Sequence, residues 1–275
     1  MTLVHAIILG LVEGLTEFLP VSSTGHLLLT QRLLGLPADD LSNAYAIVIQ
    51  GGAIVAVMGI YRRRLLEMFR GVFFGDAPGR RLLINLMVAF IPAAVIGLMF
   101  DKKIEHYLFG LWAVAAAWIF WGLVLIVFSQ AYSKKMTTVS GKNLEALLPK
   151  HAVLIGLAQS LAMWPGTSRS LVTILAALLL GFGLSTAVEF SFLLGLVTLG
   201  AATVYKAKHF GTQMFGAAGL STTLVGIFTA CLFAMLSIKW MLHYLQQHSL
   251  AIFGYWRIAV ALMAIGLILQ GTIVP

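Results

Sequence analysis

The sequence predicts an all-α, polytopic membrane protein with six transmembrane helices and two re-entrant helical hairpins, arranged as an inverted-topology repeat. Three observations support this fold class. First, 60% of the 275 residues are hydrophobic, only 10% are charged, and the mean hydropathy is +0.96. Soluble domains carry about a quarter charged residues, so the main solvent of this chain must be lipid. Second, two apolar segments are interrupted near their middle, and third, the two halves of the chain resemble each other.

The chain carries a formal net charge of +8. Basic residues of membrane proteins collect in cytoplasmic loops, and here they do not interleave with aromatic residues as on a nucleic-acid-binding surface. We therefore expect membrane lipids, and no nucleic acid, as partners of a single membrane domain spanning residues 1–275. The sequence does not determine the oligomeric state, and a homodimer is one of the alternatives.

The first apolar segment, 6–34, is expected to form a hairpin because 19–25 (LPVSSTG) interrupts it. A proline lacks a backbone donor and ends the helix before it. The flanking half-helices have about a dozen residues, too few to cross a bilayer that takes about 20. Segment 152–180 is interrupted in the same way at 165–170 (PGTSRS), which predicts a second hairpin.

The remaining apolar stretches are continuous and long enough to cross a bilayer. These six predicted spans are 44–61, 82–100, 109–128, 188–205, 219–238 and 250–270.

A weak internal repeat relates the two halves, approximately 1–135 and 150–275. AIILGLVEGLTEF, starting at Ala6, aligns with AVLIGLAQSLAMW, starting at Ala152, so that Glu13 falls opposite Gln159. With one residue deleted, PVSS at 20–23 meets PGTS at 165–168. Each half holds one hairpin and three spans, and this odd number predicts that the second half is inverted in the membrane. The interrupted helices would then meet near the midplane, where binding sites of such folds are expected.

Lysine and arginine are unequally distributed between the two sides of this topology. Eleven lie on one side, in the predicted loops 62–81 and 129–151 and at Lys239. Five lie on the other side, namely Arg32, Lys102, Lys103, Lys206 and Lys208. The positive-inside rule places the first set in the cytoplasm. Both termini and the opening of the first hairpin would then face outward.

Four charged residues lie inside apolar segments: Glu13, Glu17, Arg169 and Glu189. An ionisable group at membrane depth is a functional-site hypothesis by default. Glu13 and Glu17 share one helix face, and such a pair needs a shared proton, an arginine or a divalent cation to offset its repulsion. The alternative is that a short half-helix simply lets both carboxylates reach headgroup water.

The first hairpin tip carries Ser22, Ser23, Thr24 and His26 beside this acidic pair. Hydroxyl side chains there can cap the second half-helix. The exposed N–H groups of a helix N-terminus also bind anions, and a histidine next to hydroxyls can act as acid, base or nucleophile near neutral pH. The first tip therefore predicts a reactive centre.

The second hairpin tip combines hydroxyl groups with an arginine. Arginine binds phosphate oxygens with two parallel hydrogen bonds and stays charged. Pairing of Arg169 with Glu189 or Glu13 is the structural alternative, and it is compatible with phosphate binding. The residues that we expect at this anion site are Thr167, Ser168, Arg169, Ser170 and Thr173.

EGLTEFLPVSSTGH at 13–26 and PGTSRSLVT at 165–173 together resemble the bacitracin-resistance type of undecaprenyl-diphosphate phosphatase, over essentially the whole chain. The bulky Leu171 and Val172 depart from the small residues often found there. The resemblance implies hydrolysis of undecaprenyl diphosphate to undecaprenyl phosphate and inorganic phosphate, which recycles the carrier lipid of peptidoglycan synthesis. It also implies bacitracin resistance, a divalent cation, Mg²⁺ or Ca²⁺, and an outward-facing site in the bacterial inner membrane.

Carried over by position, Glu13 and Glu17 match the acidic motif, and Ser23 with His26 matches the hydroxyl–histidine pair. Phosphate binding would fall to hydroxyls of both tips and the arginine, with Gln50 and Glu189 as supporting residues nearby. The expected phosphate-binding residues are Arg169, Ser168, Ser22, Thr24, Ser170 and Thr173.

Two mechanisms remain open at this point. Either Ser23 attacks the terminal phosphorus and His26 takes its proton, or His26 attacks while Ser23 orients it. A flippase or secondary transporter for a lipid phosphate or organic anion is the rival function, because inverted repeats with broken helices are a transporter architecture. The Ser23–His26 pair favours the enzyme, since transport needs no nucleophile.

Overall fold

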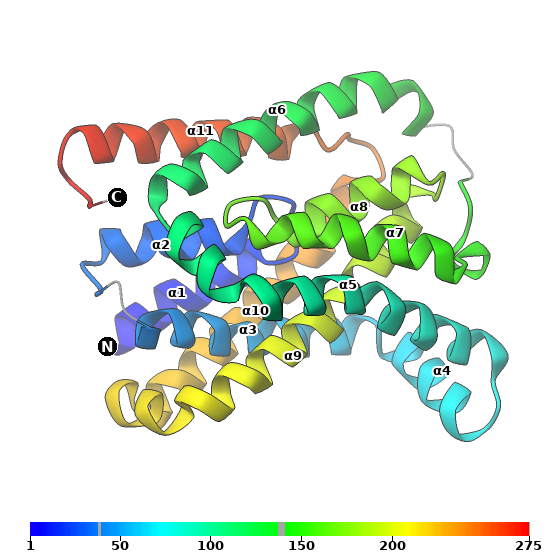
Figure 1. The fold of residues 1–275 in the computed structure, drawn as a ribbon, viewed down its shortest axis with the longest axis horizontal. Coiled ribbons are helices and arrows are strands. Elements are labelled where there is room, and N and C mark those ends of the chain that lie inside the picture. Colours follow the sequence, from blue (N-terminus) through cyan, green and yellow to red (C-terminus); the bar gives the residue numbers. More distant parts are fainter. Residues whose placement is uncertain (38–39, 137–140, 275) are drawn as a thin grey trace.

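The computed structural model describes residues 1–37, 40–136 and 141–274, and its regular elements within these ranges are helices (Figure 1). Short 3₁₀ turns lie at Leu144–Ala146 (η1) and Leu161–Met163 (η2). The α-helices are α1 (Leu3–Thr16), α2 (Ser23–Leu33), α3 (Asp40–Ile60), α4 (Arg62–Phe73), α5 (Ala77–Leu108), α6 (Leu111–Met136), α7 (Pro149–Ser160), α8 (Arg169–Leu179), α9 (Leu184–Ala218), α10 (Leu220–Tyr244) and α11 (Ala251–Leu269).

The predicted class, an all-helical polytopic membrane protein, is confirmed. Among the described residues, six helices are long and apolar enough to cross a membrane: α3, α5, α6, α9, α10 and α11. They coincide with the six predicted spans, although α5 and α9 extend well beyond the apolar stretches. Large apolar side chains remain exposed along them, as expected for helices whose outer faces contact lipid.

One element differs from the sequence prediction. The predicted loop 62–81 contains a helix, α4, formed by Arg62–Phe73. Its apolar residues recur at helical spacing between arginines, so that Met68 and Gly71 pack toward α5 while Phe69 and Phe73 stay exposed. A helix with one apolar and one basic face suits a membrane interface.

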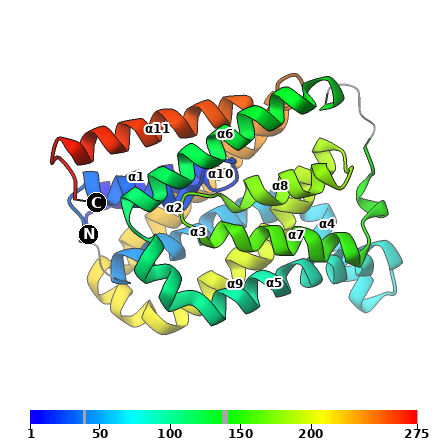
Figure 2. The same ribbon diagram turned by 45° about the horizontal axis from the view of Figure 1, so that its top comes forward.

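The two predicted hairpins are present as the helix pairs α1–α2 and α7–α8. In Figures 1 and 2 the first pair opens toward the end that holds both chain termini, and the second opens toward the opposite end, near α4. Their connecting tips meet in the middle of the molecule. This arrangement is what two hairpins entering from opposite sides require, while their placement in a membrane remains a prediction.

Packing partners of the helices are exchanged between the halves. Helix α1 packs along α10, and α7 packs along α5, whereas α6 pairs with α11 and α3 with α9. Small residues permit the close approach: a side chain at Gly14 would meet the Ala234 nitrogen at 2.8 Å, and one at Gly156 would meet Ala89. Glycine contacts of this kind bring transmembrane helices together. The first half-helix of each hairpin, α1 or α7, is thus held by a full span from the other half.

Candidate active site

The backbone of the two tips has the same unusual feature. Ser22 (φ 73°) and Ser168 (φ 76°) are the described non-glycine residues with positive φ, and each directly precedes a helix, α2 or α8. Such conformations are strained and cluster at functional sites. Ser22 therefore corresponds to Ser168, and Ser23 to Arg169. The predicted pairing of Ser23 with Ser168 is out of register by one, because the first tip has one residue fewer between its proline and its serine.

Glu17 joins the two tips. Its Oε2 accepts a hydrogen bond from the Ser23 hydroxyl, and its Oε1 accepts one from Arg169 Nη2 at 2.8 Å. The Glu17 side chain is 5% exposed and that of Arg169 12%. For an ion pair this buried, the attraction between the charges offsets the cost of removing them from water only when the hydrogen-bond geometry is good. A carboxylate from the first half thus places a hydroxyl and a guanidinium next to each other.

Arg169 is positioned by helix α9 and by the first tip. Its Nη1 donates to the Ser191 carbonyl at 3.3 Å, and its guanidinium lies 5.9 Å from the centre of the Phe18 ring. The guanidinium also rests against Gly195, where a Cβ atom would overlap it. The alternative pairing of Arg169 with Glu189 or Glu13 is not found, since its carboxylate partner is Glu17.

The hydroxyl side chains of the second tip fall into two groups. Ser168 lines the cavity described below, whereas Ser170 and Thr173 are buried and do not. Ser170 donates to the Leu19 carbonyl at 3.1 Å, which ties the two tips together. Thr173 lies 2.6 Å from the Ser191 hydroxyl on α9. Ser170 and Thr173 therefore hold the tip in place in this conformation.

His26 faces away from the cavity. Its Nδ1 lies 2.8 Å from the Ser22 carbonyl, and its Nε2 accepts a hydrogen bond from the Trp256 indole at 3.0 Å. A nitrogen that accepts from an indole carries no proton, so the proton sits on Nδ1 and is donated to Ser22. The Trp118 ring packs edge-to-face against the imidazole, with the two ring centres 5.0 Å apart. Both ring nitrogens are therefore engaged, and the Ser23 hydroxyl contacts Glu17 instead.

Glu13 lies one turn before Glu17 and is fully buried. Neither of its carboxylate oxygens has a hydrogen-bond partner among the described residues. A charge buried without a partner is costly. This carboxylate is therefore a candidate for a bound proton or cation.

Gln50 and Glu189 lie in different places. Gln50, on α3, lines the cavity as a supporting residue would. Glu189 accepts a hydrogen bond from Arg64 Nε at 2.7 Å, and Arg64 also pairs with Glu67 at 2.9 Å. The two hydrogen bonds raise the pKa of the Arg64 guanidinium above its ordinary value, and the bond to Glu189 contributes more than the bond to Glu67. Glu189 thus links α9 to α4 and does not line the cavity.

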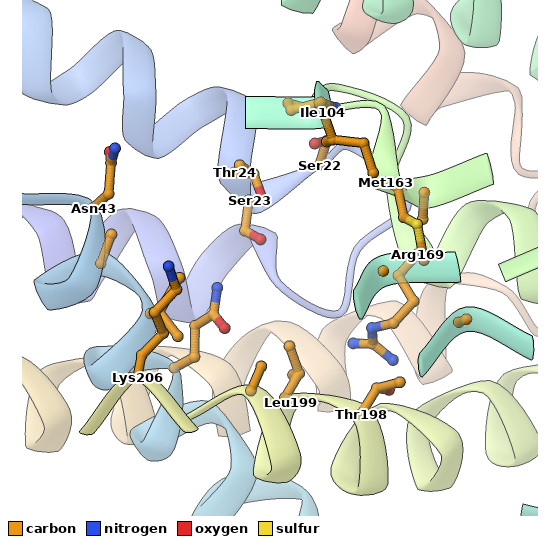
Figure 3. A pocket seen from close by; sticks show the side chains of 18 of the residues that line it. Ser22, Ser23, Thr24, Asn43, Ile104, Met163, Arg169, Thr198, Leu199 and Lys206 are labelled. Carbon is orange, nitrogen blue, oxygen red and sulfur yellow. The ribbon is translucent and has the colours of Figure 1, made fainter. Parts of the chain in front are cut away.

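A cavity of about 1000 Å³ opens next to these groups (Figure 3). Ser22, Ser23, Thr24 and Arg169 lie at the tips, and Asn43 and Lys206 line the cavity on the left of the view. Apolar side chains from α5 and α9 form much of the wall between them. Such side chains include Phe90, Ala93, Leu98, Met99, Leu199 and Ala202.

Arg257 is a buried residue at the site that was not among the residues predicted from the sequence. It lies inside the predicted span 250–270, so its signal was the same as that of Glu13 and Arg169: a charge within an apolar run. The side chain is fully buried, and it donates to the backbone carbonyls of Pro20 and Gly166. It therefore touches both tips.

Comparison with known proteins gives concordant results. A family profile described as bacitracin resistance protein BacA matches residues 6–263. The chain is 43% identical over 267 residues to undecaprenyl-diphosphatase 1 of Chromobacterium violaceum, covering 96% of each chain. It is 41% identical over 263 residues to the undecaprenyl-diphosphatase of Sorangium cellulosum, covering 95% of this chain and 85% of that one. It is 40% identical over 263 residues to the enzyme of that name in Dechloromonas aromatica, covering 96% and 93%.

Proposed function

The chain belongs to the family of bacitracin resistance protein BacA, and from this membership we propose that it hydrolyses undecaprenyl diphosphate to undecaprenyl phosphate and inorganic phosphate. One observation carries the proposal: Glu17 holds the Ser23 hydroxyl and the Arg169 guanidinium together beside a large cavity with apolar walls. The reaction regenerates the carrier lipid of peptidoglycan synthesis. These groups can supply a nucleophile and charge stabilisation for phosphoryl transfer, and the apolar walls can accommodate a lipid.

The cavity suits an amphiphilic substrate. Arg169 and the start of α8 offer donors to the terminal phosphate, and the start of α2 brings a second set of backbone N–H groups. The apolar walls from α5 and α9 then accommodate the isoprenoid chain. Ser22, Thr24 and Ser168 line the same polar end as further hydrogen-bond donors.

The contacts favour Ser23 over His26 as the nucleophile. The Ser23 oxygen attacks the terminal phosphorus, its proton passes to Glu17, and the bond to the bridging oxygen breaks to release undecaprenyl phosphate. Water then hydrolyses the phosphoserine, which yields inorganic phosphate and restores the serine hydroxyl. Arg169 stabilises the charge that gathers on the phosphoryl oxygens. His26, with both nitrogens engaged, fixes the shape of the first tip.

The buried carboxylate of Glu13 is a suitable ligand for a divalent cation, Mg²⁺ or Ca²⁺. The two Glu13 oxygens are buried without donors, and both cations prefer carboxylate ligands. Among the described residues no group of three or more His, Cys, Asp or Glu side chains could hold a metal. The proposed cation would therefore rest on the Glu13 and Glu17 carboxylates together with ligands from outside the chain. A bound cation would neutralise charge on the diphosphate.

A phosphate-release assay on purified protein with the lipid diphosphate and Mg²⁺ tests the proposal. We expect Ser23→Ala and Arg169→Ala each to lower turnover by at least about 100-fold. Ser129→Ala is the matched control, because Ser129 is a buried serine whose hydroxyl has no partner in the described part of the chain. Near-normal turnover of Ser23→Ala would exclude Ser23 as the nucleophile. A wild type that releases no phosphate would favour a flippase instead.

Trapping the phosphoenzyme distinguishes the two nucleophiles. With substrate labelled at the terminal phosphate, acid quenching should leave an acid-stable adduct at Ser23. An acid-labile adduct at His26 would contradict the serine mechanism and would require the imidazole to leave both of its hydrogen-bond partners.

The six apolar helices make the chain a multi-pass membrane protein. The proposed location is the bacterial inner membrane, with the cavity open to the outer side. Two observations support this orientation: the eleven basic residues of the predicted cytoplasmic side, and the position of both termini at the other end of the molecule (Figure 1).

A further inference from the structure

Arg257 on α11 is a fully buried arginine. Burying a guanidinium is costly unless its donors find acceptors. Among the described residues it forms no ion pair. Its two Nη groups both donate to backbone carbonyls, whereas its buried Nε has no partner. The contacts of the two Nη groups to the main chain of other segments therefore offset part of the cost of burying this group.

The two carbonyls occupy equivalent places in the two tips. Nη1 donates to the Pro20 carbonyl at 3.1 Å, and Nη2 donates to the Gly166 carbonyl. Pro20 precedes the positive-φ residue Ser22 by two positions, and Gly166 precedes Ser168 by two. One planar guanidinium thus spans corresponding atoms from the two halves of the chain.

Helix α11 itself contributes no described residue to the lining of the cavity. Its residues act from behind: Arg257 binds both tips, and the neighbouring Trp256 donates to His26 in the first tip. The first tip carries Ser23 and Glu17, and the second carries Arg169. The separation of these groups depends on how the two tips are held.

We propose that Arg257 is a positioning residue that clamps the two hairpin tips and so sets the distance between the Ser23 hydroxyl and the Arg169 guanidinium. The inference rests on the proposed phosphatase function for its kinetic readout. A guanidinium offers two Nη groups in a fixed plane, whereas a lysine offers one ammonium centre on a flexible chain. Lysine keeps the positive charge but cannot bridge both carbonyls in this way.

Arg257→Lys is therefore the informative variant, measured in the phosphate-release assay with kcat and KM determined separately. We expect kcat to fall at least about tenfold, because a displacement of about 1 Å can slow a reaction about a hundredfold. KM should change less than about threefold, since Arg169 and the cavity are intact. Arg64→Lys, an arginine on α4 away from the tips, is the matched control and should keep both constants.

Hydrogen exchange gives a readout that does not depend on activity. In Arg257→Lys the amides of segments 19–26 and 165–172 should exchange at least about tenfold faster, while those of α3 and α10 keep their rates. If Arg257→Lys does not fold, Gly122→Ala replaces it. A methyl there would meet Ile258 Cγ1 at 2.9 Å and the Gly254 carbonyl at 3.0 Å, and so would displace α11 with Arg257 unchanged.

Three results would overturn the proposal. One is a kcat of Arg257→Lys within about twofold of the wild type. The second is a rise in KM alone, which would make Arg257 a source of positive potential for substrate binding rather than a clamp. The third is unchanged exchange in both tips. A wild type that releases no phosphate would refute the proposed function, and the exchange measurement would still test the clamp.

Discussion

At the scale of single residues, the site depends on what each carboxylate contacts. Glu13 and Glu17 lie one turn apart at α1, but their surroundings differ. Glu17 accepts from Ser23 and Arg169, whereas the oxygens of the fully buried Glu13 have no partner among the described residues. The two residues therefore have different tasks: Glu17 organises the reacting groups, and Glu13 is available to hold a proton or a cation.

Glu13→Gln tests this division. The amide removes the charge with little change in volume, so we expect the cation concentration for half-maximal turnover to rise at least about tenfold. Titration of Mg²⁺ and Ca²⁺ in the phosphate-release assay measures it. Glu67→Gln, on α4, is the control for a carboxylate away from the cavity and should leave the cation dependence unchanged. An unchanged titration for Glu13→Gln would show that Glu13 does not hold the cation.

At the scale of elements, helix α9 forms the surface on which Arg169 rests. The Ser191 carbonyl accepts from Nη1, and the absence of a side chain at Gly195 leaves room for the guanidinium. Nearer its start the same helix is tied to α4 by the Glu189–Arg64 pair. Gly195 of α9 therefore affects the site through the room that it leaves for the Arg169 guanidinium, although a glycine has no functional group of its own.

Gly195→Ala should move the Arg169 guanidinium away from its place beside Glu17. We expect kcat/KM to fall about 10- to 100-fold while the protein stays folded, because alanine favours a helix more than glycine does. Steady-state kinetics and thermal unfolding in detergent measure the two effects. Gly200→Ala on the same helix is the matched control, since no atom outside the adjacent part of its own helix lies within 4 Å of the position that its new methyl group would take. Equal kinetics of the two variants would contradict the proposed role of Gly195.

At the scale of the whole molecule, the exchanged packing of the helices brings two distant segments together. Helix α1 packs on α10 and α7 on α5, so the first half-helix of each hairpin is fixed by a span from the other half. Glu17 and Arg169 are 152 positions apart in sequence and yet form an ion pair at 2.8 Å. The site is therefore a property of the assembled chain rather than of either half.

The proposed orientation can be tested by cysteine labelling in a Cys231→Ser background. A membrane-impermeant maleimide should label Thr272→Cys in intact spheroplasts and Arg80→Cys only after permeabilisation. Both positions are exposed; the first is three residues from the C-terminus, and the backbone of the second contacts Gly71 of α4. Labelling of both after permeabilisation shows that each thiol is reactive. The reverse pattern would place the cavity mouth on the cytoplasmic side.

Local signals in the sequence were enough to predict the lipid solvent of this protein, its six spans, the two interrupted segments and the candidate residues Glu17, Ser23 and Arg169. These signals are the length of an apolar run, a proline within it, and a charge where lipid is expected. The pairing of Arg169 with Glu17 rather than Glu189, the turn of His26 toward Trp256, and the bridge that Arg257 makes between the tips came from the tertiary structure alone. The physical reason is that a partner is chosen by where side chains point after distant helices have packed, and no local pattern encodes that direction.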